Sequence, residues 1–196
     1  MTKNIDLHTQ LVLKILKGFN SKPIDGKIKF QKIAFLVLRN FEERFEFFDF
    51  KPHKFGPYSE SLDYALEEIK NKEEAGIEKD TIKITENGKK KLNELESITE
   101  LSEKEKKNKE LIEKAIENIK EAFINFTSNE MLAFIYKSEP DYIGDSIVAD
   151  KMDYEKIFLE LYDKGELGIS KIAELMGWEF QEAYDFIRKN TKLQIL

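Results

Sequence analysis

The chain has 196 residues, of which 41% are hydrophobic and 12% aromatic, so it suits one or two folded domains rather than a disordered tail. The absence of cysteine excludes disulfide scaffolds and thiol nucleophiles, and two histidines, His8 and His53, argue against a zinc site. No apolar run approaches the roughly 20 residues of a membrane span, and the first ten residues lack the order of a secretory signal. We therefore expect a cytoplasmic protein that binds no metal and no cofactor.

The charge is unevenly distributed. The net charge is −6, yet residues 1–60 hold 11 basic and 7 acidic side chains, whereas residues 61–196 hold 21 and 31. An anionic partner is therefore expected to contact the first part of the chain. Abundant Lys and Glu with few Gln are typical of hyperthermophile proteins, which indicates a habitat but no activity.

The first half of the chain predicts the order helix, helix, strand, helix, hairpin, helix. The second helix is apolar around most of its circumference, which predicts that it is buried. An aromatic, alternating stretch predicts the strand, and Ser59 and Thr85 stand where N-caps of later helices belong. The predicted ranges, in chain order, are 5–19, 27–41, 45–55, 59–73, 76–85 and 86–95.

The second half begins with a long amphipathic helix predicted over 103–126, whose apolar stripe either seals the N-terminal core or pairs with a second copy in a homodimer. Thr127 and Glu130 have capping-box spacing before a short helix that Pro140 ends. A connecting loop is expected over 141–152.

The last segment has helix-turn-helix spacing. It consists of a helix over 154–163, a helix capped by Ser170, a turn at Gly177 and a third helix, with Trp178 packed between the last two helices. The predicted fold class is thus mainly α with a small β wing, a winged helix-turn-helix core plus a helical C-terminal extension. Its predicted parts are 1–98, 99–150 and 151–196.

Three short motifs resemble the SocA-like antitoxin domain, also called Panacea, and the related YwgA-like group. They are Phe30-Gln31-Lys32, the turn Phe55-Gly56-Pro57-Tyr58-Ser59, and Ile84-Thr85 with Gly88. Phe30 and Ile84 stand where that pattern has Leu. The resemblance covers roughly residues 5–145 and implies a winged-helix fold with a regulatory or antitoxin role, without catalytic residues. ISKIAELMGW near the C-terminus is similar to small antitoxin-like helix-turn-helix proteins.

A lysine-rich helix start is the first candidate for a DNA contact, because lysines and helix N-termini bind phosphates. The alternative is that these lysines only solvate an exposed edge and that Gln31 hydrogen-bonds a loop. The turn before Ser59 and the predicted hairpin add further basic residues. The full candidate set is Lys27, Lys29, Gln31, Lys32, Lys51, His53, Lys54, Lys79, Lys83, Lys89, Lys90 and Lys91.

The turn Phe55-Gly56-Pro57-Tyr58-Ser59 also has a structural explanation. Glycine permits an unusual backbone angle, proline directs the chain, serine caps the next helix, and the two aromatic residues anchor the turn in the core. On this interpretation the turn shapes the fold, and only Lys51, His53 and Lys54 beside it would face a partner.

Two functions remain open. The first is a DNA-binding transcriptional regulator that contacts mainly the backbone, and the second is an antitoxin-like module that holds a partner protein. Acidic residues on the predicted groove-binding helix, among them Glu60, Asp63, Glu67 and Glu68, oppose base recognition, because carboxylates near phosphates weaken binding. No nucleophile, P-loop or dinucleotide motif is present, so we expect no enzyme.

Overall fold

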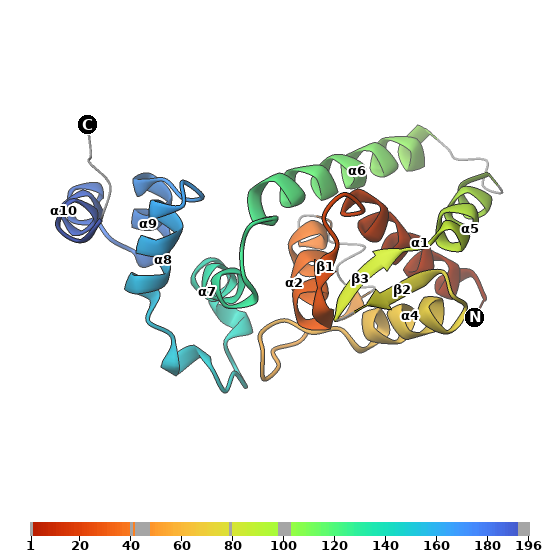
Figure 1. Cartoon of the computed structure of the whole chain (residues 1–196), viewed down its shortest axis with the longest axis horizontal. Coiled ribbons are helices and arrows are strands. Elements are labelled where there is room, and N and C mark those ends of the chain that lie inside the picture. Colours follow the sequence, from red (N-terminus) through yellow and green to blue (C-terminus); the bar gives the residue numbers. More distant parts are fainter. Residues whose placement is uncertain (1, 40, 42–47, 79, 98–102, 192–196) are drawn as a thin grey trace. The chain divides into compact units, whose positions relative to one another are not determined.

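The computed structural model describes residues 2–39, 41, 48–78, 80–97 and 103–191. These residues form a mainly helical protein with a small three-stranded antiparallel sheet (Figure 1). The chain divides into two compact units, which are described separately. The N-terminal unit comprises Met1–Lys51 and Pro57–Ile124, and the C-terminal unit comprises Pro52–Gly56 and Asn125–Leu196.

The N-terminal unit holds all three strands. Its sheet has the order β1-β3-β2, and Ile82 of the central strand pairs with Ile24 on one side and Ile77 on the other. The expected hairpin over 76–85 is confirmed, with Asp80 at a positive φ of 69° in its turn. The elements are α1 (Thr2–Gly18), β1 (Ile24–Asp25), α2 (Gly26–Leu38), α4 (Glu60–Asn71), β2 (Ala75–Glu78), β3 (Thr81–Ile84), α5 (Glu86–Ser97) and α6 (Glu103–Phe123).

The strand predicted over 45–55 is wrong where the structure describes it. Residues 42–47 lie outside the described residues, and between Phe48 and Phe55 only Lys51 forms a bridge, to Tyr58. Asp49 has a positive φ of 43°, which interrupts extended backbone. The strand that joins the hairpin is instead β1, so the order begins helix, strand, helix.

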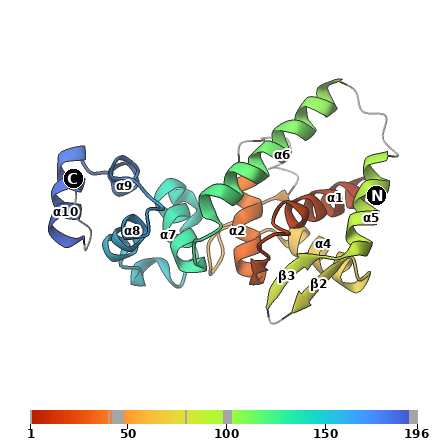
Figure 2. The same cartoon turned by 45° about the horizontal axis from the view of Figure 1, so that its top comes forward.

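The helix α2 is the centre of this unit, as predicted. Every residue from Lys29 to Leu38 is buried, and α2 packs against α4 and α6. Figure 2 shows α6 passing over α1 and α2, and contacts between these elements agree with that view. Ile112, Ile116 and Phe123 of α6 are buried there. The apolar stripe therefore seals the core of the unit, which was one of its two expected uses.

The C-terminal unit is wholly helical in its described residues. Thr127 and Glu130 form the expected capping box at the start of α7, which ends two residues before Pro140. The expected loop over 141–152 contains two short 3-10 helices. The elements are α7 (Ser128–Ser138), η1 (Pro140–Tyr142), η2 (Ala149–Lys151), α8 (Tyr154–Asp163), α9 (Ile169–Met176) and α10 (Phe180–Asn190).

The α9–α10 pair has a left-handed residue at its turn. Gly177 has φ 67° and ψ 29°, as a tight helix end requires, which confirms the predicted position of the turn. The predicted cap is wrong, because α9 begins at Ile169 with Gly168 in the cap position, so Ser170 lies inside the first turn. Trp178 is half-buried and packs edge-to-face on Phe186 of α10, with ring centroids 5.2 Å apart.

Candidate functional site

Gln31 and the start of α4 are joined by a pair of hydrogen bonds in the N-terminal unit. The Gln31 Nε2 donates to the carbonyl oxygen of Ser59 at 3.0 Å, and the Ser59 N–H donates to Gln31 Oε1 at 3.1 Å. Both residues are buried. The amide therefore pairs with both backbone groups of Ser59: the buried N–H depends on Gln31 Oε1, and the carbonyl oxygen also accepts the Asp63 N–H at 3.1 Å. This geometry supports the loop-bonding interpretation of Gln31 over a phosphate contact.

Lys32 adds a third bond to the same turn. Its Nζ donates to the carbonyl oxygen of Pro57 at 2.7 Å, and the residue is 2% exposed. Burial lowers the pKa of the Lys32 amine from 10.5 to about 7. We call Gln31, Lys32, Pro57 and Ser59 the clamp. A side chain held inside in this way does not present its amine to a phosphate.

Ser59 is the N-cap of α4, as predicted. Its Oγ accepts a hydrogen bond from the Leu62 N–H at 3.1 Å and donates to the carbonyl oxygen of Phe48. Gly56 has a positive φ of 77°, and Pro57 is buried. The structural explanation of the turn thus accounts for its glycine, proline and serine. Phe55 and Tyr58 are only half-buried, so they anchor the turn less deeply than expected.

Several of the lysines proposed for DNA contact pair with carboxylates. Lys27 contacts Asp63 at 3.4 Å and also pairs with Glu67, and its hydrogen bond to Glu67 raises the pKa of Lys27. Lys51 pairs with Asp49 at 2.7 Å and Lys89 with Glu86 at 2.6 Å. These pairs reduce the positive charge that the sequence suggested for this part of the chain.

The remaining candidates are distributed over several elements. Lys29 is buried on α2, Lys83 of β3 and Lys91 of α5 are half-buried, and Lys90 of α5 is exposed. His53 and Lys54 are exposed and belong to the C-terminal unit. Lys79 lies outside the described residues. The structure therefore brings Gln31 and Lys32 together in the clamp, and it places Lys27 against the carboxylates of α4.

The outer face of α4 carries an aromatic residue that the sequence analysis did not single out. Tyr64 is 67% exposed, Glu60 is also exposed, and Glu67 beside them is half-buried. The apolar face of the same helix, with Leu62, Ala65, Leu66 and Ile69, is buried. The sequence did contain a signal for the exposure of Tyr64, because this large aromatic residue falls on the polar side of an amphipathic helix.

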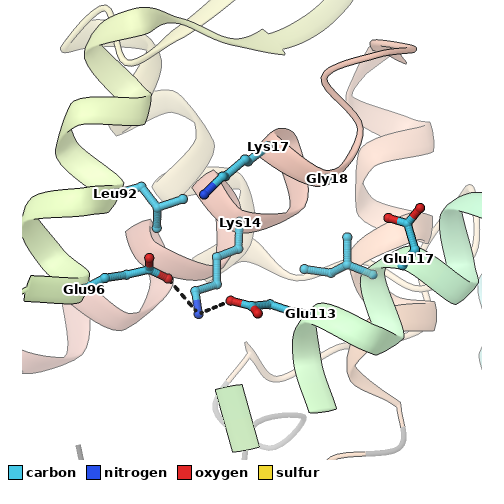
Figure 3. A pocket seen from close by; sticks show the side chains of 8 residues that line it. Lys14, Lys17, Gly18, Leu92, Glu96, Glu113 and Glu117 are labelled. Atoms are coloured by element: carbon cyan, nitrogen blue, oxygen red, sulfur yellow. Dashed lines mark ion pairs between the residues drawn. The ribbon is translucent and has the colours of Figure 1, made fainter. Parts of the chain in front are cut away.

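A pocket of about 400 Å³ lies among α1, α5 and α6 (Figure 3). Lys14 reaches across it to Glu96 at 3.2 Å and Glu113 at 3.7 Å. Burial lowers the pKa of Lys14, against the raising effect of Glu96. The Lys14 amine thus joins α1 to α5 and α6. This ion pairing gives Lys14 a structural role.

A second pocket, of about 500 Å³, lies in the C-terminal unit. Lys164 pairs there with the buried carboxylate of Glu130, which also belongs to the α7 capping box. Among the described residues, no group of three or more histidine or acidic side chains is arranged to hold a metal ion.

No protein-family model, curated protein or solved structure matches this chain. Across the described part of the chain, no helix has the length and apolar character needed to cross a membrane.

Proposed function

We propose that this chain is an antitoxin-like interaction module that binds a partner protein through the exposed face of α4. The observation that carries the proposal is Tyr64, which is 67% exposed on a helix whose opposite face is buried. Tyrosine is enriched among the residues that dominate protein interfaces. The acidic side chains Glu60 and Asp63 on the same helix suit a protein partner better than a phosphate backbone.

The scaffold proposed for this module is a winged helix-turn-helix. The strand β1 lies between α1 and α2, and in the sheet order β1-β3-β2 the hairpin supplies the central strand β3 and the edge strand β2. That arrangement is the one expected when a hairpin forms the wing and α4 is the second helix of the motif. On this proposal α4, which would enter the DNA groove in a regulator, serves as the protein-binding helix.

The Tyr64→Ala variant tests the protein-binding proposal. We expect immobilised wild-type protein to retain one stoichiometric partner from an extract of its source cell, and Tyr64→Ala to weaken this binding by at least about tenfold, as loss of an interface anchor does. Leu111→Ala is the matched control, because Leu111 is an exposed apolar residue on α6 at 43% exposure. It should bind like the wild type.

Quantitative pull-down with matched melting temperatures is the measurement. Two results would contradict the proposal: the wild type retains no stoichiometric protein, or Tyr64→Ala retains as much partner as Leu111→Ala.

DNA backbone binding is a second candidate, favoured by the run Lys89-Lys90-Lys91 in α5 beside the hairpin. If it is correct, a random duplex should be retarded in a gel at about 50 mM salt and released by about 200 mM, because phosphate contacts displace counterions. Replacing Lys90 and Lys91 with alanine should abolish the shift, while Lys151→Ala, an exposed lysine of the C-terminal unit, should leave it unchanged. No retardation at the lower salt rules this candidate out.

A further inference from the structure

The Lys32 amine lies in the interior beside one neutral acceptor. Within the part of the chain that the structure describes, the carbonyl oxygen of Pro57 is the hydrogen-bond partner of Lys32 Nζ. An ammonium has three N–H donors and needs either water or a carboxylate when it is removed from solvent. A neutral amine fits this site better, because it places no charge in the interior and one of its N–H groups is bonded to the Pro57 carbonyl oxygen.

The charged groups on the surrounding elements do not compensate a charge on Lys32. Asp63 and Glu67 of α4 pair with Lys27. On α1 and α6, Lys14 pairs with Glu113. None of these carboxylates forms a described ion pair with Lys32. Glu68 of α4 pairs with Lys72. Other titratable groups on these elements include Lys29 on α2, Tyr58 in the turn, Glu60, Tyr64 and Lys70 on α4, His8 and Lys17 on α1 and Glu117 on α6.

We propose that the clamp is a proton-linked latch: the Pro57–Ser59 turn leaves α2 when Lys32 moves into water and takes up a proton. In the closed state Lys32 is an uncharged donor to Pro57, and Gln31 holds Ser59. In the open state the amine is hydrated and charged. Because Ser59 caps α4, opening also frees the first turn of that helix.

The direction of the pH dependence follows from the two states. Burial holds the pKa of Lys32 at about 7 in the closed clamp, and exposure returns it toward 10.5. Opening therefore takes up a proton between these pH values and becomes easier as the pH falls from about 10.5 toward 7. Below about pH 7 both states carry the proton, so the dependence ends there.

Amide hydrogen exchange of the full chain tests the latch. The probes are the amides of Ser59 and Leu62, which donate to Gln31 Oε1 and to Ser59 Oγ. After correction for intrinsic exchange, the equilibrium constant for opening at both amides should rise on the order of 50-fold as the pH is lowered from about 9 to about 7. Below about pH 7 it should level off. This readout needs only the wild-type protein.

Two variants separate Lys32 from other titrating groups. Lys32→Met should remove the pH dependence at both amides, whereas Lys27→Met, which removes a partly exposed, ion-paired amine from the same helix, should keep it. The latch is overturned if wild-type protection at these amides is independent of pH after correction. It is also overturned if a folded Lys32→Met protein retains the wild-type pH dependence.

Discussion

Replacing Gln31 with alanine is expected to lower the free energy of unfolding of the N-terminal unit by about 2 to 4 kcal/mol, because it leaves the buried N–H of Ser59 without its partner and removes one of the two hydrogen bonds to the Ser59 carbonyl oxygen. The Ser59 N–H donates to Gln31 Oε1, whereas the Ser59 carbonyl oxygen would keep the Asp63 N–H as a donor at 3.1 Å after losing Gln31 Nε2. The lost side chain also leaves a void beside α4. Urea unfolding followed by circular dichroism measures the change.

The matched control is Lys27→Ala, one turn earlier on the same helix. Lys27 forms partly exposed ion pairs with Asp63 and Glu67, which are worth about 1 kcal/mol or less. A loss of under about 1 kcal/mol in Gln31→Ala, comparable to the control, would mean that the amide does not hold the start of α4.

Gly88→Ala is expected to destabilise the same unit by about 2 to 3 kcal/mol, although alanine is the better helix former by about 1 kcal/mol. A Cβ on Gly88 would lie 2.1 Å from the carbonyl oxygen of Glu74, a backbone atom that cannot move aside cheaply. That oxygen also accepts the Thr85 N–H at 3.0 Å. The added methyl group therefore disturbs the junction of hairpin and α5.

Asn87→Ala gives the comparison for Gly88→Ala. Asn87 is exposed on the same turn of α5, so its replacement should be neutral or slightly stabilising. The melting temperatures of the two variants measure the difference. If Gly88→Ala melts at or above the melting temperature of Asn87→Ala, a Cβ at position 88 does not clash with the Glu74 carbonyl oxygen, and the explanation is wrong.

The helices were predictable because their signals are local. Ser59, Thr127 and Gly177 each mark a helix end through one side chain or one backbone angle, and the structure places all three as expected. The Thr85 Oγ likewise accepts the Gly88 N–H at 3.1 Å at the start of α5. The burial of α2 followed from its apolar circumference.

The strands were less predictable because their pairing is not local. β1 is only Ile24–Asp25, too short to produce an alternating pattern, and it is a strand through its pairing with β3. The aromatic alternation near Phe48 and Phe50 instead reflects two buried rings in a stretch where Phe48 is helical and Asp49 lies in a turn. Alternation alone does not distinguish a strand from such a segment.

The clamp was half predictable. A helix that is apolar around its circumference leaves little exposed surface for polar residues in its middle, so the burial of Gln31 and Lys32 follows from the same pattern that buried α2. The usual exposure of lysine argued the other way. Their partners, Pro57 and Ser59, lie more than 20 residues away and required the fold.

The most direct test of this account is the titration of Lys32 in the intact protein, followed by the ¹³Cε chemical shift of that residue. An internal clamp predicts a pKa of about 7 for Lys32, well below the ordinary lysine value of about 10.4. A Lys32 titration near 10.5 would place the amine in water and contradict the closed clamp between α2 and the turn.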